Sequence, residues 1–312
     1  MNEEVKYAPI VLFVYNRPGH TRKTLEALQL NQLADKSVLY VYADGAKADA
    51  SQEQLQGIAE VRSIVREQQW CSEVRLIERE TNMGLADNII AGVTEVVNLH
   101  GRIIVLEDDL ITSKGFLQYM NDALELYKDE ERVMHISGYM YPIKLKEKTT
   151  VFLNVATPWG WATWKRAWNF FERNPLELKL RIQNYPLFSN ESFNSGFGNE
   201  FTWQLEKNVT GEIKTWAVLW HSSIFLRQGY CLHPVRTLIF NIGFDGSGIH
   251  CKDEPNRLQQ KIIDFIRLRL EPIVVKEETL RAFKNYYLSF SNTTKLSIFK
   301  RILTKFKIKQ SG

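Results

Sequence analysis

The stretch RIIVLEDD, residues 102–109, joins an apolar run directly to three adjacent carboxylates. The apolar run predicts a strand buried on both faces, of the kind found inside parallel sheets. Glu107, Asp108 and Asp109 follow it, and three adjacent carboxylates repel one another. A divalent cation such as Mg²⁺ or Mn²⁺, which prefers oxygen ligands, would relieve that repulsion. The alternative interpretation is a solvated acidic turn that caps the next helix.

Upstream of this stretch, strand and helix patterns alternate. Strands are predicted at residues 9–15, 37–42 and 74–77, and helical spacing follows each of them. This alternation indicates a mostly parallel sheet with helices on both faces. In such sheets ligands bind at the carboxyl ends of the strands, so polar residues at those ends are the candidate site residues.

Two more strands end in polar residues. Asn16-Arg17 follows the first strand, and Asp44, in an Asp-Gly pair, follows the second. Arg17 is either a surface turn residue or a partner for phosphate, and Asp44 either a turn residue or an acceptor for a base or ribose. The chain has no Gly-x-Gly-x-x-Gly after the first strand and no P-loop motif. A metal ion therefore fits a diphosphate better here than a glycine-rich loop.

Charge and cysteine usage narrow the class of protein. The 312 residues are 44% hydrophobic with a net charge of +4, but residues 291–312 hold six basic residues and no acid. The rest has 34 basic against 36 acidic residues, which argues against a nucleic-acid-binding body. The three cysteines show neither metal-ligand spacing nor a disulfide framework. With no apolar run long enough to span a bilayer, we expect a cytoplasmic protein.

The alternation of strands and helices loosens near residue 113. We therefore predict a nucleotide-binding half over 1–112 and an acceptor-binding half over 113–290 of the same domain. Residues 156–236 contain seven of the eight tryptophans. A basic amphipathic tail follows over 291–312, either solvated or lying on an anionic membrane surface.

The order of these motifs resembles that of GT-A glycosyltransferases, which have a Rossmann-like α/β fold. Residues 103–138 are similar to the N-acetylglucosaminyltransferase I family, and the loop with Asn82 and Gly84 looks like that of bacterial relatives in polysaccharide and glycoconjugate synthesis. The resemblance implies a nucleotide-sugar donor. Asp109 would bind the metal and Asp44 the uracil. The donor-binding set it implies is Asn16, Arg17, Asp44, Asn82, Glu107 and Asp108.

The resemblance extends less evenly into the second half. A segment rich in Trp and Gly lies near the donor sugar and acceptor in that family, so Trp159 and Trp161 are the predicted acceptor-binding residues, in a loop; the alternative for each is a place in the core. Glu200 matches the position of the catalytic base in that family. The alternative is that it is only a favourable acid in the first turn of a helix. His250, in a glycine-rich segment, is a predicted metal ligand or a surface residue.

Together these features predict a metal-dependent, inverting glycosyltransferase. It would use Mn²⁺ or Mg²⁺ to move a sugar from a nucleoside-diphosphate sugar, such as a UDP-sugar, to a glycan or glycolipid hydroxyl. The expected setting is bacterial surface polysaccharide or glycoconjugate assembly, peripheral to the inner face of the membrane. A sugar nucleotidyltransferase and a non-catalytic carbohydrate-binding protein on a decayed transferase fold are the alternatives.

Overall fold

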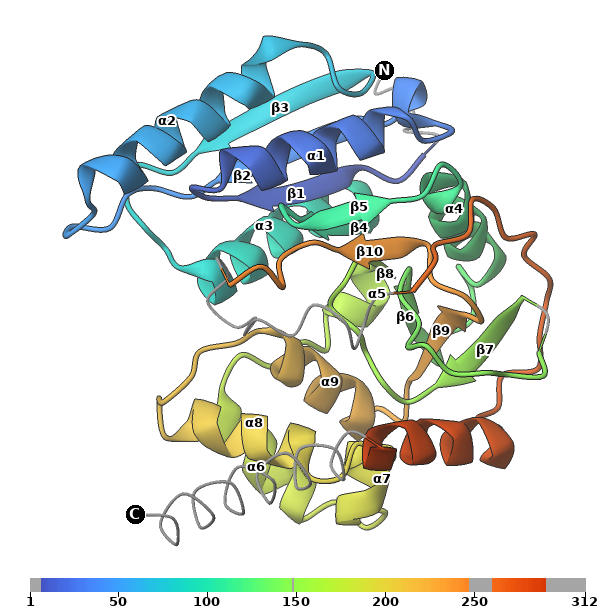
Figure 1. Cartoon of the computed structure of the whole chain (residues 1–312). Coiled ribbons are helices and arrows are strands. Elements are labelled where there is room, and N and C mark those ends of the chain that lie inside the picture. Colours follow the sequence, from blue (N-terminus) through green and yellow to red (C-terminus); the bar gives the residue numbers. More distant parts are fainter. Residues whose placement is uncertain (1–6, 148, 247–259, 290–312) are drawn as a thin grey trace, which may run out of the picture.

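The computed structural model describes residues 7–147, 149–246 and 260–289. The first part of the chain alternates strands and helices, as the apolar patterns predict (Figure 1). Its elements are β1 (Ile10–Val14), α1 (Pro18–Gln29), the 3₁₀ helix η1 (Ala34–Lys36), β2 (Val38–Ala43), α2 (Gln52–Glu67), β3 (Glu73–Glu78), α3 (Leu85–His100), β4 (Arg102–Glu107), β5 (Leu110–Thr112) and α4 (Phe116–Leu126).

The later part adds strands to the same sheet and a group of helices beside it. Its elements are β6 (Val133–Ser137), β7 (Thr150–Leu153), β8 (Trp161–Trp164), α5 (Lys165–Trp168), α6 (Pro175–Gln183), α7 (Asn190–Asn194), α8 (Glu200–Val209), α9 (Ala217–Leu226), β9 (Tyr230–Pro234) and β10 (Ile239–Asn241). A helix over 277–289 packs through Phe283 against β7 and α7–α8 side chains.

The main sheet has eight strands in the order β3-β2-β1-β4-β8-β6-β9-β7, and six of them run in one direction. The predicted α/β class, with a mostly parallel sheet flanked by helices, is confirmed. β4 of the first half pairs with β8 of the second, so the two segments share one sheet. β5 and β10 form a separate two-stranded sheet.

Hydrophobic side chains cover both faces of the sheet. Alternate residues of β1 belong to two different hydrophobic layers. Leu12 packs toward α1, α2 and α4, while Val11 and Phe13 pack toward α3, α5 and α9. Successive strand side chains point to opposite faces, which is why a run without polar residues is needed where both faces are covered. The sheet is thereby fixed as a rigid base for the residues at its edge.

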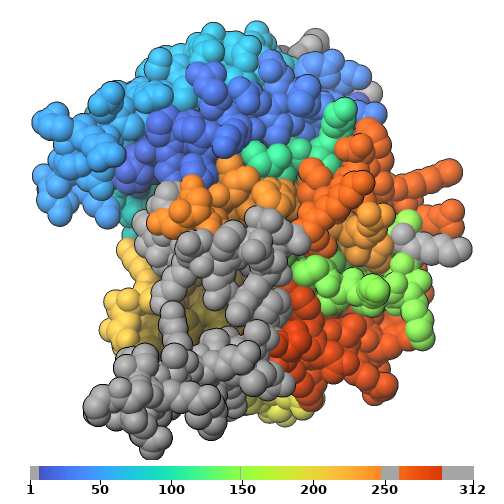
Figure 2. Space-filling model, in the orientation of Figure 1, coloured from blue at the N-terminus to red at the C-terminus, as the bar shows by residue number. Residues whose placement is uncertain are grey.

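The segment around β10 crosses the face that Figure 2 shows, between the blue N-terminal half above and the yellow and red segments below. Ile239 to Asn241 of this strand pair antiparallel with β5, next to the acidic turn. Within the described ranges, no helix combines the length and apolar character that a membrane span needs.

Candidate active site

One cleft, with a volume of about 550 Å³, collects residues from both halves of the chain. Of the eleven predicted site residues, nine line it: Asn16, Arg17, Asp44, Asn82, Glu107, Asp108, Asp109, Trp159 and Glu200. His250, predicted as a metal ligand, lies outside the described residues. Trp161 is described and does not line the cleft.

Strand register explains why residues so far apart in sequence meet. In the parallel ladders, Val14 of β1 is paired with Ala43 of β2, and Phe13 with Glu107 of β4. The strands therefore end at one edge of the sheet, and the residues after them share that edge. This edge forms the wall of the cleft that carries the predicted donor-binding residues.

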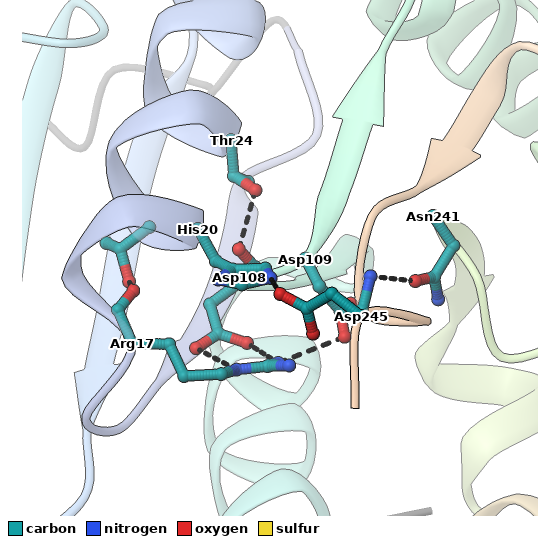
Figure 3. A network of polar contacts seen from close by, with 9 residues as sticks. Arg17, His20, Thr24, Asp108, Asp109, Asn241 and Asp245 are labelled. Atoms are coloured by element: carbon teal, nitrogen blue, oxygen red, sulfur yellow. Dashed lines mark hydrogen bonds and ion pairs between the residues drawn. The ribbon is translucent and has the colours of Figure 1, made fainter. Parts of the chain in front are cut away.

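Arg17 joins the two aspartates of the acidic turn (Figure 3). Its Nη2 donates to Asp108 Oδ1 and, at 3.0 Å, to Asp109 Oδ2, while Nε donates to Asp108 Oδ2 at 3.3 Å. Its Nη1 is buried and has no hydrogen-bond partner among the described residues. Burial alone lowers the pKa of Arg17, but the two carboxylates outweigh it and raise that pKa. Arg17 therefore stays charged and keeps one donor unpaired.

Burial also changes the charge state of the acids. It raises the pKa of Glu107 to about 8, with further contributions from Asp109 and Asp108. It raises the pKa of Asp108 to about 6, because the Arg17 guanidinium offsets only part of the cost of burying the charge. At neutral pH Glu107 is therefore largely uncharged, and one guanidinium faces the two aspartates of the turn, an arrangement that still favours an additional cation.

The described residues contain no group of three or more His, Cys, Asp or Glu side chains that could hold a metal ion. The residues of the acidic turn instead fit a cation whose other ligands are oxygens of a bound diphosphate. Asp109 uses Oδ2 for Arg17, and no hydrogen bond within the described chain engages its Oδ1. Mg²⁺ in nucleotide sites commonly takes one or two carboxylates together with substrate phosphates and water. A single carboxylate oxygen is thus a sufficient protein contribution.

Asp44 lines the cleft, but its carboxylate is fully engaged. Oδ1 accepts from the backbone N–H groups of Gly45 and Met83, both at 2.9 Å, and Oδ2 accepts from Gly84 N at 3.0 Å and Asn82 Nδ2 at 3.1 Å. A carboxylate has about four acceptor sites. The Asp44 side chain therefore holds the 82–84 loop, and its contact with uracil stays a prediction.

The acceptor-binding role predicted for Trp161 is corrected. The predicted loop at this position is the strand β8, and the Trp161 side chain is fully buried, with its ring stacked on Trp216 at 5.0 Å between centroids. Because the ring belongs to a buried hydrophobic cluster, it has no face open to a sugar. Trp159, by contrast, is half-buried in the cleft wall, and Tyr139 and Phe244 hold its ring edge-on at 4.5 and 5.6 Å.

Among the aromatic residues of the cleft that the sequence interpretation left out, Trp203 is the most exposed. Trp203 is 47% exposed and lines the cleft from α8. Its spacing of three residues from Glu200 is the signal that could have found it, because residues at i and i+3 share a helix face. Glu200 itself is the first residue of α8, and its Oε1 accepts from Gln204 Nε2 at 2.8 Å.

The segment after β10 packs against the acidic turn. Ile242 donates its backbone N–H to Asp109 O at 2.9 Å, and a Cβ on Gly243 would lie 2.3 Å from Asp109 Oδ2. His20 of α1 pairs with Asp245 of this segment, with Nε2 and Oδ2 3.1 Å apart (Figure 3). The acidic turn is thus held from both sides, by α1 and by the segment after β10.

No family model and no curated protein sequence matches this chain. Its fold is similar to that of solved glycosyltransferases. The mannosyltransferase PcManGT from Pyrobaculum calidifontis, in complex with GDP-Man and Mn²⁺, is 11% identical over 72% of this chain and 71% of its own, with a TM-score of 0.39.

Two further solved structures are similar at the same level. The galactosyltransferase LgtC, in complex with donor and acceptor sugar analogues, is 6% identical over 70% of each chain, with a TM-score of 0.37. Mouse xyloside xylosyltransferase 1 is 11% identical over 70% of this chain and 80% of its own, with a TM-score of 0.33. Because all three TM-scores lie below 0.5, the residues of the cleft alone carry the functional proposal.

Proposed function

We propose that this chain is a glycosyltransferase that moves a sugar from a nucleoside-diphosphate sugar to a hydroxyl of a glycan or glycolipid. The observation that carries the proposal is the meeting, in one cleft, of the residues after β1, β2 and β4 with Glu200 at the start of α8. One wall offers charged and amide groups for a nucleotide diphosphate, and the other offers a carboxylate and an aromatic ring for an acceptor.

The donor wall supplies groups for each part of a UDP-sugar. Arg17, with Nη1 unpaired, is our partner for the diphosphate. Both amide hydrogens of Asn82 are used, on Asp44 Oδ2 and Gly45 O, so its Oδ1 remains as an acceptor for the uracil N–H. Glu107 and Asp108 are the partners we propose for the sugar and ribose hydroxyls.

A divalent cation, Mn²⁺ or Mg²⁺, held by Asp109 would stabilise the charge of the departing diphosphate. In an inverting transfer, the acceptor hydroxyl attacks the anomeric carbon from the side opposite the leaving group. Glu200 takes the hydroxyl proton as the new bond forms. Its Oε1 is held by Gln204, which leaves Oε2 for the acceptor.

Glu200→Gln tests this assignment. The amide cannot take the proton, so we expect transfer to fall by at least about 100-fold, while UDP-sugar binding stays within about twofold because Glu200 is not on the donor wall. Binding would be followed by thermal shift of a UDP-sugar panel with Mg²⁺, and transfer by release of UDP. Glu206→Gln, on an exposed position of the same helix, is the control. Full transfer by the Glu200 variant would remove it as base.

The setting we propose is bacterial surface polysaccharide or glycoconjugate synthesis, with residues 291–312 on an anionic membrane surface. This tail lies outside the described residues, and its support is the sequence pattern of apolar and basic side chains. Removing 291–312 should release the protein from phosphatidylglycerol vesicles in a sedimentation assay. Transfer to a soluble acceptor should be unchanged. Equal sedimentation of both proteins would contradict the membrane role.

A further inference from the structure

The cleft exposes one indole ring that the fold does not use. Trp203 is 47% exposed, and no aromatic neighbour or hydrogen bond engages its side chain within the described chain. By contrast, Trp70, Trp161 and Trp220 are fully buried. Leaving nearly half of an indole in water forgoes the apolar stabilisation that burial gives, so an exposed tryptophan inside a cleft points to a ligand.

Trp203 shares its helix face with two polar side chains of the same cleft. Glu200, Trp203 and Gln204 are at positions i, i+3 and i+4 of α8, and all three line the cleft. The Gln204 amide donates to Glu200 Oε1 at 2.8 Å, which fixes the two polar groups relative to each other. Glu200 Oε2 and Gln204 Oε1 remain as acceptors for hydroxyl groups.

We infer that this face of α8 is the acceptor subsite and that Trp203 is its stacking platform for a pyranose ring. A pyranose presents an apolar face of C–H groups and a rim of hydroxyls. Trp203 suits the apolar face, and the oxygens of Glu200 and Gln204 suit the hydroxyls. This inference rests on the proposed function, and it replaces Trp161 by Trp203 in the acceptor role.

The charges near the platform select a neutral sugar. Glu200 is the acid on this face, and a sugar carboxylate beside it would be repelled. The basic residues that line the cleft are engaged or distant from this face: Lys214 pairs with Asp87, Arg17 is engaged by Asp108 and Asp109, and Lys47 follows β2 on the donor wall. The subsite therefore binds an uncharged hexopyranose in preference to a uronic acid.

Saturation-transfer NMR with the full chain tests the platform directly. The probes are methyl glycosides of glucose, galactose, mannose and N-acetylglucosamine, with methyl glucuronide as the charged comparison. We expect at least one neutral glycoside to receive saturation at its ring C–H groups, and the glucuronide to receive little. Trp203→Ala should raise the apparent Kd of that glycoside about tenfold or more, and Trp203→Phe should restore part of the affinity.

Phe170→Ala is the matched control, because Phe170 is 45% exposed but does not line the cleft. UDP binding with Mg²⁺ is measured in parallel and should be the same in all variants. If wild type binds no glycoside, or if Trp203→Ala binds it equally well, the platform is wrong while UDP binding still supports the transferase. If UDP does not bind but glycoside binding depends on Trp203, the platform stands and the transferase proposal fails.

Discussion

At the scale of single residues, Asp44 links the end of β2 to the 82–84 loop, which lines the cleft. Its carboxylate closes β2 and accepts hydrogen bonds from residues 82–84, which precede α3. The neighbouring Gly45 allows this approach, because a Cβ there would lie 2.4 Å from the backbone of Thr81. The Asp-Gly pair at this strand end thus fastens the loop, and in our proposal Asn82 makes the contact with the base.

Asp44→Asn distinguishes this lock from a direct nucleotide contact. Each carboxylate oxygen of Asp44 accepts from two N–H donors, and one of these pairs would face the NH₂ group of the new amide. Those donors would then be left unsatisfied in a buried place. We expect a loss of about 2 kcal/mol in the free energy of unfolding, measured by urea denaturation. Asp35→Asn, on an exposed residue, is the control. Unchanged stability with lost UDP binding would return Asp44 to the base contact.

At the scale of elements, the segment after β10 fixes the position of the Asp109 carboxylate. The β5–β10 pairing brings Gly243 so close that Asp109 Oδ2 occupies the space of a side chain. This contact depends on two strands more than a hundred residues apart in sequence. It is therefore a tertiary constraint on the acidic turn, and one that local sequence patterns do not contain.

Gly243→Ala should displace the Asp109 carboxylate and lower sugar transfer by about tenfold or more, because small misplacements at a reacting centre cost large rate factors. Gly19→Ala is the matched control: it lies in α1, next to the site, and its Cβ would meet nothing within 4 Å. That variant should keep full activity and gain slightly in stability. Turnover would be measured as UDP release. Equal activity of the two variants would show that Gly243 does not constrain Asp109.

The sequence predicted the elements that have a local apolar pattern, and it missed those that depend on contacts between distant residues. The strand expected at residues 9–15 is β1, and the apolar run before the three adjacent carboxylates is β4, which includes Glu107. β8 was missed because Pro158 and Gly160 before it resemble a loop, whereas pairing with β4 and β6 makes it a central strand. Trp203 was missed because the exposure of its side chain depends on the surrounding helices, which the spacing of the tryptophans does not reveal.

At the scale of the whole molecule, two ion pairs join the first and second halves of the chain beside the cleft. Asp87, in the first turn of α3, pairs with Lys214 and, at 2.7 Å, with Arg173. Arg173 and Lys214 are 66% and 70% exposed, so solvent screens these pairs and their contribution to stability is small. The shared sheet and the buried aromatic cluster around Trp161, rather than these charges, hold the halves together.

The second half of the chain contains a buried histidine that makes the fold sensitive to acid. His221 of α9 is buried: Nε2 lies 2.9 Å from Phe193 O, its ring stacks on Phe201 at 3.9 Å, and Nδ1 has no hydrogen-bond partner among the described residues. Burial lowers its pKa to about 4, and the contact with Phe193 offsets only part of this. Protonation would place an unpaired N–H and a charge in an apolar layer, so folding requires the neutral ring.

Because the folded pKa of His221 is below that of the unfolded chain, about 6.5, its contribution to stability is complete above that pH. It is lost as the pH falls toward 4, by about 3 kcal/mol in total. We expect urea denaturation of His221→Gln, which keeps a donor for Phe193 O but does not titrate, to show a shallower fall of the unfolding free energy between pH 7 and pH 4. The exposed acids are identical in both proteins, so their titration cancels in the difference. Parallel curves for variant and wild type would mean that His221 is protonated in the folded protein or plays no part in its acid sensitivity.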